Sequence, residues 1–260
     1  MGDAAGSGFV ALSALSVVAV GTAYFAVLYF ATGGFTWWLT RRVLPALHWG
    51  RVLDPRSLLP GQLRRELRES AGSILIFGVG LLLPWGLLRL GWAKLATDAS
   101  LLQVACEIAA LFLWNELHFY ANHRLLHTAP LRRFHGDHHR SHVATPWSTY
   151  ALHPVEALLL GSVPIIPMLL HDFSFAALFC LPVFSIVLNN LGHSNYELTR
   201  RPSARGPLGA SRRHHLHHAC YHGNYGFLLE VFDRRAGSVL PVDAADARIG
   251  KTRRDFAEDG

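Results

Sequence analysis

The chain has 260 residues, of which 51% are apolar and 16% are charged, and its formal net charge is +6. Because soluble domains carry about 25% charged residues, this composition argues against a soluble protein and favours an integral membrane protein. The basic residues lie between apolar segments, which fits contact with anionic lipid better than nucleic-acid binding. The three cysteines form no CxxC pair, which argues against a disulfide framework and against a thiolate metal site.

Five apolar segments predict an all-α, polytopic membrane fold with about four to five apolar helices. The first segment has no basic region before it and is too long for a signal peptide, so it predicts a retained helix. Pro84 predicts a kink in the second segment. The last two segments are separated only by His171 and Asp172, which predicts a tight hairpin. In chain order the segments cover about residues 8–32, 73–91, 101–120, 155–170 and 173–192.

Arginine residues orient these segments in the membrane. They are abundant in the connections 39–70 and 121–150 and after residue 195, and the connection 92–100 has none. By the positive-inside rule the basic connections are cytoplasmic, which places every histidine-rich stretch on the cytoplasmic face. Frequent Arg, Ala and Leu are typical of a GC-rich bacterial genome, so we expect the bacterial inner membrane, with the endoplasmic reticulum as the eukaryotic alternative.

Most of the 16 histidines fall in two short stretches, 118–142 and 214–222. The first stretch begins with an HxxxH pattern, whose i, i+4 spacing places both imidazoles on one helical face. Two HxxHH patterns follow, and one more histidine ends the last apolar segment. These nine residues are His123, His127, His135, His138, His139, His193, His214, His217 and His218. Nine imidazoles exceed the needs of one ion and predict two, although imidazole suits Zn, Cu, Fe and Ni alike.

A single pattern of this kind also fits a role in solubility or pH sensing, but three on one membrane face favour a metal site. The remaining histidines stand outside the patterns and are interpreted as structural or surface residues, except His153, which stays a candidate ligand. A metal transporter or metal-sensing membrane protein is the competing class. Against it, the histidines gather outside the apolar segments, whereas a transport path needs polar residues near the middle of the bilayer.

The motifs resemble those of the fatty acid hydroxylase / sterol desaturase superfamily, which are membrane-bound histidine-box di-iron oxygenases. The order HxxxH, HxxHH, HxxHH in a polytopic chain carries the resemblance, which covers about residues 115–240. Neighbouring matches are YANHR at 120–124, HPVE at 153–156, NNLGHSNYE at 189–197 and NYG at 224–226. The resemblance implies an N-terminal transmembrane region at 1–100, a fatty acid hydroxylase-like catalytic domain at 101–240 and a polar C-terminal tail at 241–260.

The resemblance further implies a cytosolic helical cap that carries two non-haem iron ions, with O2 as co-substrate. The nine histidines would be the metal ligands, and no catalytic residue beyond them is implied. The implied activity is that of a monooxygenase that hydroxylates a C–H bond of a fatty acyl or sterol-like lipid in lipid biosynthesis. The same site would serve a lipid or sterol desaturase or a sterol methyl oxidase, and the motifs do not separate these reactions.

One position departs from the family pattern. Several relatives have a further histidine four residues before the equivalent of His193, where this chain has Asn189. Either Asn189, through a water molecule, or His153 then completes the metal shell. Candidate carboxylates to accept hydrogen bonds from the ligand imidazoles are Glu116, Asp137 and Glu156.

The expected partners are a membrane lipid as substrate and a separate electron donor. The chain contains no dinucleotide fingerprint, haem attachment motif or Cys-rich cluster. The electrons would therefore come from an external protein such as a cytochrome b5, a ferredoxin or a reductase. No nucleic acid is expected as a partner.

Overall fold

The computed structural model describes residues 2–199 and 203–245, so the predicted tail lies outside the described residues from 246 onward. Among the described residues the regular secondary structure is helical apart from one short antiparallel pair, β1 (Arg51–Val52) and β2 (Tyr196–Glu197). The longer helices are α1 (Gly2–Ala11), α2 (Ala14–Trp38), α4 (Gln62–Gly80), α5 (Leu82–Arg89), α6 (Leu101–Leu126), α8 (Pro154–Gly161), α10 (Phe175–Gly192) and α11 (Ala210–Cys220). The shorter ones are η1 (Leu39–Val43), α3 (Leu44–Ala46), η2 (Arg132–Phe134), α7 (Gly136–His139), η3 (Pro146–Tyr150), α9 (Ile165–Leu170), η4 (Pro207–Gly209) and α12 (Val231–Ala236).

All five predicted apolar segments are helical, and three helices are long and apolar enough to cross a membrane. These three cover Ala14–Ala46, Gln62–Arg89 and Phe175–Gly192. The segment predicted at 155–170 forms the shorter helices α8 and α9. The segment predicted at 101–120 lies in α6, where buried polar residues such as Glu107 reduce the apolar character.

Two helix boundaries depend on single residues. The expectation of one helix over 8–32 was wrong at its start, because Ser13 caps α2 by accepting a hydrogen bond from the Ser16 N–H at 3.1 Å. The kink predicted at Pro84 is confirmed as the break between α4 and α5 at Leu81. Pro84 has no N–H to donate to the carbonyl of Gly80, so the helix cannot continue regularly through this turn.

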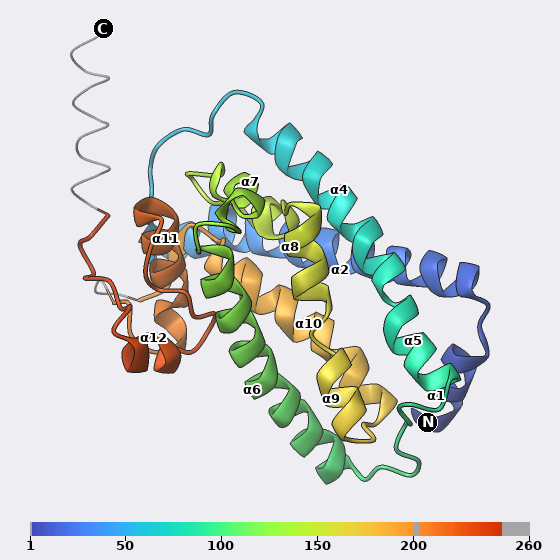
Figure 1. Cartoon of the computed structure of the whole chain (residues 1–260). Helices are drawn as coiled ribbons and strands as arrows, with labels where there is room; N and C mark the ends of the chain where they lie inside the picture. Colours follow the sequence, from blue (N-terminus) through green and yellow to red (C-terminus); the bar gives the residue numbers. More distant parts are fainter. Residues whose placement is uncertain (1, 200–202, 246–260) are drawn as a thin grey trace, which may run out of the picture.

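Five helices pack in a ring, in which α6 contacts α10, α10 contacts α2, α2 contacts α4, α4 contacts α8, and α8 contacts α6. Figure 1 shows that the helix ends and connections form two groups at opposite ends of the molecule. The last turns of α6 and α10 and the first turn of α8 meet α7 and α11 at one end, while the 90–100 and 171–174 connections lie at the other. The histidine-rich segments therefore share one end, as the alternation of basic connections predicts.

Aromatic side chains form the core where α2 and α4 meet η3. Tyr29 stacks on Tyr150 at 5.6 Å between ring centroids, and its hydroxyl donates to the carbonyl of Trp147 at 2.7 Å. The close approach of α2 and α4 requires a glycine at position 78, because a Cβ there would lie 2.1 Å from Thr22 Oγ1. This packing fixes η3 directly beneath the histidine-rich end.

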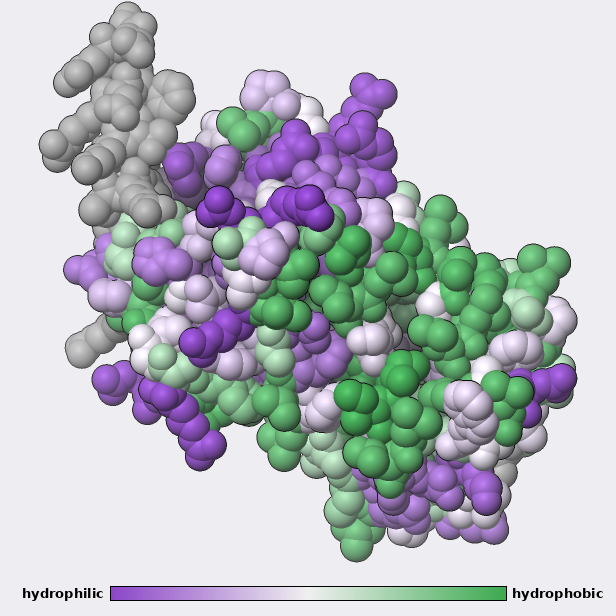
Figure 2. Space-filling model, in the orientation of Figure 1, coloured by the Kyte–Doolittle hydropathy of each residue, from purple (hydrophilic) through white to green (hydrophobic). Residues whose placement is uncertain are grey.

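The buried carboxylate of Glu197 links two distant segments at the polar end of the molecule. Glu197 is 1% exposed and forms ion pairs with Arg51 at 2.7 Å and Arg212 at 2.6 Å. Burial raises the pKa of Glu197, but the hydrogen bonds from the two guanidinium groups outweigh this effect and lower the pKa to about 2. Figure 2 shows that hydrophilic residues gather over the α7 and α11 end, whereas hydrophobic residues cover much of the helical bundle.

Candidate metal centre

Nine histidines meet at the polar end of the bundle in two groups. The first group is His123, His127, His135, His139 and His217, and the second is His138, His193, His214 and His218. Within each group, one ring nitrogen of every residue lies within 4.8 Å of the others. These are the eight histidines of the three sequence patterns together with His193. His127 is the partly exposed member, and the other eight are at most 5% exposed.

The two HxxHH patterns divide between the groups in opposite ways. The i, i+4 pair of the first pattern, His135 and His139, joins the first group, and its third residue joins the second group. The i, i+4 pair of the second pattern, His214 and His218, joins the second group, while His217 joins the first. Residues four apart lie above one another on a helix, so each pair acts together and the third imidazole points to one side. The spacing predicted eight of these residues as a set, without His193, and it did not predict this division.

Hydrogen bonds from Nδ1 orient four of the imidazoles. The Nδ1 partners are the carbonyl oxygen of Tyr225 for His123 at 2.9 Å, the carbonyl oxygen of Gly223 for His217 at 2.7 Å, Glu156 Oε1 for His135 at 2.7 Å and Ser148 Oγ for His193 at 2.7 Å. A carbonyl oxygen only accepts, so Nδ1 carries the proton in His123 and His217. Their Nε2 atoms then keep the lone pair that a metal ion needs.

The Nε2 atoms lie at the spacing of donor atoms around one ion. His217 Nε2 lies 3.1 Å from His139 Nε2 and 3.2 Å from His127 Nε2. In the second group, His214 Nε2 lies 2.8 Å from His193 Nε2 and 3.0 Å from His218 Nε2. Imidazole nitrogens bound to one ion at about 2.1 Å are separated by about 3 Å when their bonds are near right angles.

Unpaired buried nitrogens also fit a bound cation in the first group. The Nε2 atoms of His123 and His135 have no hydrogen-bond partner among the described residues. Leaving a buried polar atom unpaired is costly, and facing lone pairs repel each other unless a cation lies between them. The all-imidazole donor set therefore fits a first-row transition metal in each group.

Burial keeps the histidines in the form that binds metal. It lowers the pKa of His135 to about 3 and the pKa of His138 to about 4. Burial and the neighbouring imidazoles also hold the pKa of His214, His217 and His218 well below the ordinary value. These side chains are therefore neutral at pH 7, the protonation state that a metal ligand requires.

Of the three carboxylates predicted to orient the ligands, Glu156 accepts from His135 and the other two lie elsewhere. Glu116 accepts hydrogen bonds from the backbone N–H groups of Leu228 at 3.0 Å and Leu229 at 2.7 Å. It holds the segment that follows α11. Asp137 lies 3.5 Å from Arg140, with 39% of its side chain exposed.

The two candidates to complete the metal shell stand outside both histidine groups. His153 caps α8, where its Nδ1 accepts from the N–H of Val155 at 3.2 Å. Asn189 lies closer to the centre, because it lines a space of about 10 Å³ together with His123 and His138. Whether either residue takes part in metal binding stays a prediction.

Sequence reasoning missed the turn that returns the chain beneath the histidines. Tyr221, Gly223 and Asn224 have positive φ angles of 63°, 70° and 50°. This turn brings the carbonyl groups of Gly223 and Tyr225 to the ligand imidazoles, and it places the Tyr221 ring 4.3 Å from the His139 ring. The Gly and Asn residues directly after the last HxxHH pattern were the available signal.

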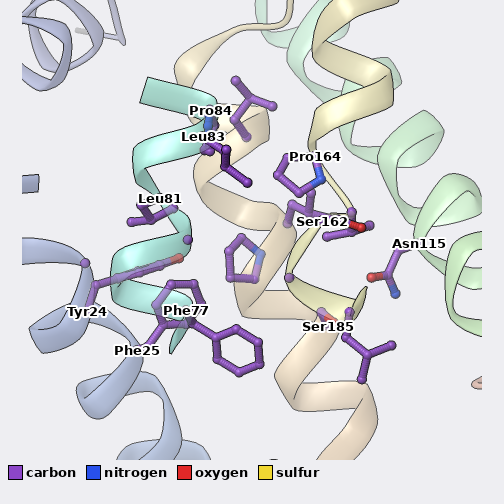
Figure 3. Close-up of a pocket in the computed structure, with 18 of the residues that line it drawn as sticks. Tyr24, Phe25, Phe77, Leu81, Leu83, Pro84, Asn115, Ser162, Pro164 and Ser185 are labelled. Atoms are coloured by element: carbon purple, nitrogen blue, oxygen red, sulfur yellow. The ribbon is translucent and has the colours of Figure 1, made fainter. Parts of the chain in front are cut away.

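An apolar cavity of about 290 Å³ lies inside the helical ring, next to the centre. Figure 3 shows its walls, which include Tyr24, Phe77, Leu83 and Asn115. Phe119 is one of the residues that line both this cavity and the small space beside the histidines, so the two spaces adjoin across shared side chains. The sequence did not predict this cavity, because the cavity arises from how the helices pack.

The chain is similar in sequence to a known family and to several characterised proteins. Residues 108–238 match the family model described as fatty acid hydroxylase. The chain is 30% identical over 223 residues to a Delta(7)-sterol 5(6)-desaturase of Eremothecium gossypii, a match that covers 79% of this chain and 61% of the relative. It is 27% identical over 190 residues to the lathosterol oxidase of Homo sapiens, covering 69% and 62%.

A third relative has a different activity. The chain is 26% identical over 185 residues to a very-long-chain aldehyde decarbonylase of Arabidopsis thaliana, a match that covers 65% of this chain and 27% of the relative. The chain thus spans about three fifths or less of the length of these curated relatives. No solved structure matches the chain.

Proposed function

The chain belongs to the fatty acid hydroxylase family, in the fatty acid hydroxylase / sterol desaturase superfamily, and on this basis we propose that it is a di-iron oxidoreductase that oxidises a C–H bond of a lipid with O2 and external electrons. The observation that carries the proposal is the junction of two histidine groups with an apolar cavity. The histidines supply ligands for two ions, and the cavity offers an apolar molecule a place beside them.

We propose hydroxylation as the reaction, because the matched family model is described as fatty acid hydroxylase. Desaturation is the second candidate, and the relative from Eremothecium gossypii supports it, because that protein is a Delta(7)-sterol 5(6)-desaturase. A pair of iron ions would supply the redox chemistry in either case, because this donor set suits iron and zinc does not change its oxidation state.

The contribution of the protein is to place the ligands and to keep water away from the reacting carbon. Backbone carbonyl groups and Glu156 hold the imidazoles in a fixed orientation. Phe119 and Leu152 separate the histidines from the main cavity with apolar surface. We propose the nine histidines as metal ligands, with Asn189 beside them as one of the residues that line both the cavity and the space beside the histidines.

The chain is a multi-pass membrane protein, since three of its helices are long and apolar enough to cross a bilayer. We propose that the centre faces the cytoplasm, because the basic connections lie at the same end as the histidines. The proposed membrane is the bacterial inner membrane, or the endoplasmic reticulum in a eukaryote. The proposed electron donor is a separate protein such as a cytochrome b5, a ferredoxin or a reductase.

Metal analysis and lipid analysis together test this function. Protein purified after iron-replete expression should contain about two iron ions per chain, and lipids of expressing cells should include a species changed by one oxygen or by two hydrogens. His138→Ala and His217→Ala should each abolish the product while leaving the protein in the membrane. Asp137→Asn is the matched control, because this carboxylate lies next to the ligands in sequence but faces Arg140. Zinc alone in the protein, or an unchanged lipid profile with altered metal uptake, would contradict the proposal.

A further inference from the structure

Two neighbouring helices lead from the cavity to the metal centre with the same spacing of side chains. On α6, Asn115 and Phe119 precede His123 at intervals of four residues. On α10, Ser185 and Asn189 precede His193 at the same intervals. Residues at i, i+4 and i+8 lie on one helical face. Because α6 and α10 pack together and both end at the histidine groups, the two rows run side by side.

The first residue of each row, which lies farthest from the metal centre, is polar although the cavity is mostly apolar. Both Asn115 and Ser185 line it, and Figure 3 shows them on neighbouring helices toward the same side of the space. Asn115 is only 4% exposed, and its Nδ2 finds no hydrogen-bond partner among residues 2–199 and 203–245. An unpaired amide is costly inside an apolar bundle, so this group has the character of a binding group for a ligand oxygen.

We propose that Asn115, assisted by Ser185, binds a hydroxyl or carbonyl oxygen of the lipid substrate. This inference rests on the proposed lipid-oxidising function and adds the position of a polar group on its substrate. Asn115 Nδ2 donates to the lipid oxygen, and the Ser185 hydroxyl can donate to the same atom or accept from a lipid hydroxyl.

The spacing along the helices sets the distance between this oxygen and the metal centre. Eight residues of α-helix rise about 12 Å, so the polar pair lies about 12 Å along the bundle from His123 and His193. Phe119 and Asn189, which line both the cavity and the space beside the histidines, occupy the interval. The substrate class is therefore an elongated apolar molecule with a hydrogen-bonding oxygen about 12 Å from the carbon that reaches the centre. A long-chain alcohol or ketone and a fused-ring sterol both satisfy this description.

A competition experiment tests the contact without turnover. Purified protein in detergent micelles is incubated with an equimolar pair of probes that differ by one oxygen, and the retained ratio is measured by mass spectrometry. One arm uses 1-hexadecanol against hexadecane, and the other uses 5α-cholestan-3β-ol against 5α-cholestane. Empty micelles give the reference ratio. We expect wild-type protein to favour the alcohol in at least one arm, and this arm identifies the lipid class.

The variants decide which residues carry the preference. Asn115→Leu should reduce the alcohol-to-alkane ratio by about fivefold to tenfold, the effect of one lost hydrogen bond. Ser185→Ala should reduce this ratio by a smaller factor. If the Asn115→Leu protein does not accumulate, the ratio measured with Ser185→Ala tests the inference in its place. Ser162→Ala is the matched control, because this cavity hydroxyl already donates to the carbonyl of Leu159 at 2.7 Å. Its ratio should equal that of the wild type.

The outcomes separate this inference from the proposed function. A wild-type ratio equal to that of empty micelles in both arms, or an unchanged ratio in Asn115→Leu, would overturn the inference even if iron and an oxidised lipid are present. A preference that Asn115→Leu removes, in protein that holds no iron and forms no product, would support the inference and overturn the oxidising function instead.

Discussion

Replacing Glu156 tests whether the centre depends on a carboxylate that does not itself belong to either histidine group. Glu156 is 2% exposed, and its Oε1 accepts from His135 Nδ1 at 2.7 Å. Glu156→Leu removes the acceptor and leaves a buried N–H without a partner. Loss of such a hydrogen bond to a ligand imidazole typically weakens metal binding by about 10- to 100-fold, which corresponds to about 1.4–2.8 kcal/mol. Glu156→Gln keeps an oxygen acceptor but loses the charge, so a smaller loss is expected.

Chelator competition measures this effect on purified protein. Iron-loaded wild type, Glu156→Leu and Glu156→Gln are titrated with a chelator of known affinity, and the iron that remains bound is counted. Asp137→Asn provides the control, because its carboxylate lies near the ligands in sequence and is 39% exposed. Wild-type iron affinity in a folded Glu156→Leu protein would refute the argument that this hydrogen bond fixes His135 for metal binding.

Three further predictions follow from the geometry. His217→Ala should weaken iron binding in the first group, and His138→Ala should weaken iron binding in the second group. Each single variant should therefore retain about one iron per chain by metal analysis. Gly78→Ala should destabilise the protein by about 1–3 kcal/mol in thermal unfolding, because its Cβ would meet Thr22 Oγ1 at 2.1 Å. The metal-free protein should lose stability as the pH falls below about 6.5, because the unfolded chain binds protons that His135, with a folded pKa of about 3, cannot bind. The loss should approach about 1.4 kcal/mol per pH unit for each such histidine, and a melting temperature that is flat from pH 7.5 to 5.5 would contradict it.

The histidine positions could be predicted from the sequence because helical spacing encodes a shared face. An HxxxH pair such as His123 and His127 needs only one helix to bring its imidazoles together. The division into two groups depends on how α7 and α11 face each other, which no local pattern records. His138 and His139 are adjacent in sequence yet belong to different groups.

The helices were predicted in outline and their ends were not. Apolar composition identified the segments, but the start of α2 depends on the hydrogen bond of one serine inside an apolar run. The partners of the ligands were hidden for a similar reason. Ser148 and the carbonyl of Gly223 reach His193 and His217 only because the chain folds back, and neither residue type signals such a role in sequence. The division into regions 1–100, 101–240 and 241–260 stays a prediction.

Residues from both halves of the chain line the cavity, so both halves can influence which lipid fits. The matched family region begins at residue 108, yet α2, α4 and α5 supply a large part of the cavity wall, including Tyr24, Phe25 and Phe77. The nine histidines of the two groups all lie within the matched region. A change in the first hundred residues can therefore reshape the space for the lipid without touching a ligand of the metal centre. This separation gives a physical reason why relatives of this chain can act on different lipids, as a sterol desaturase and an aldehyde decarbonylase do.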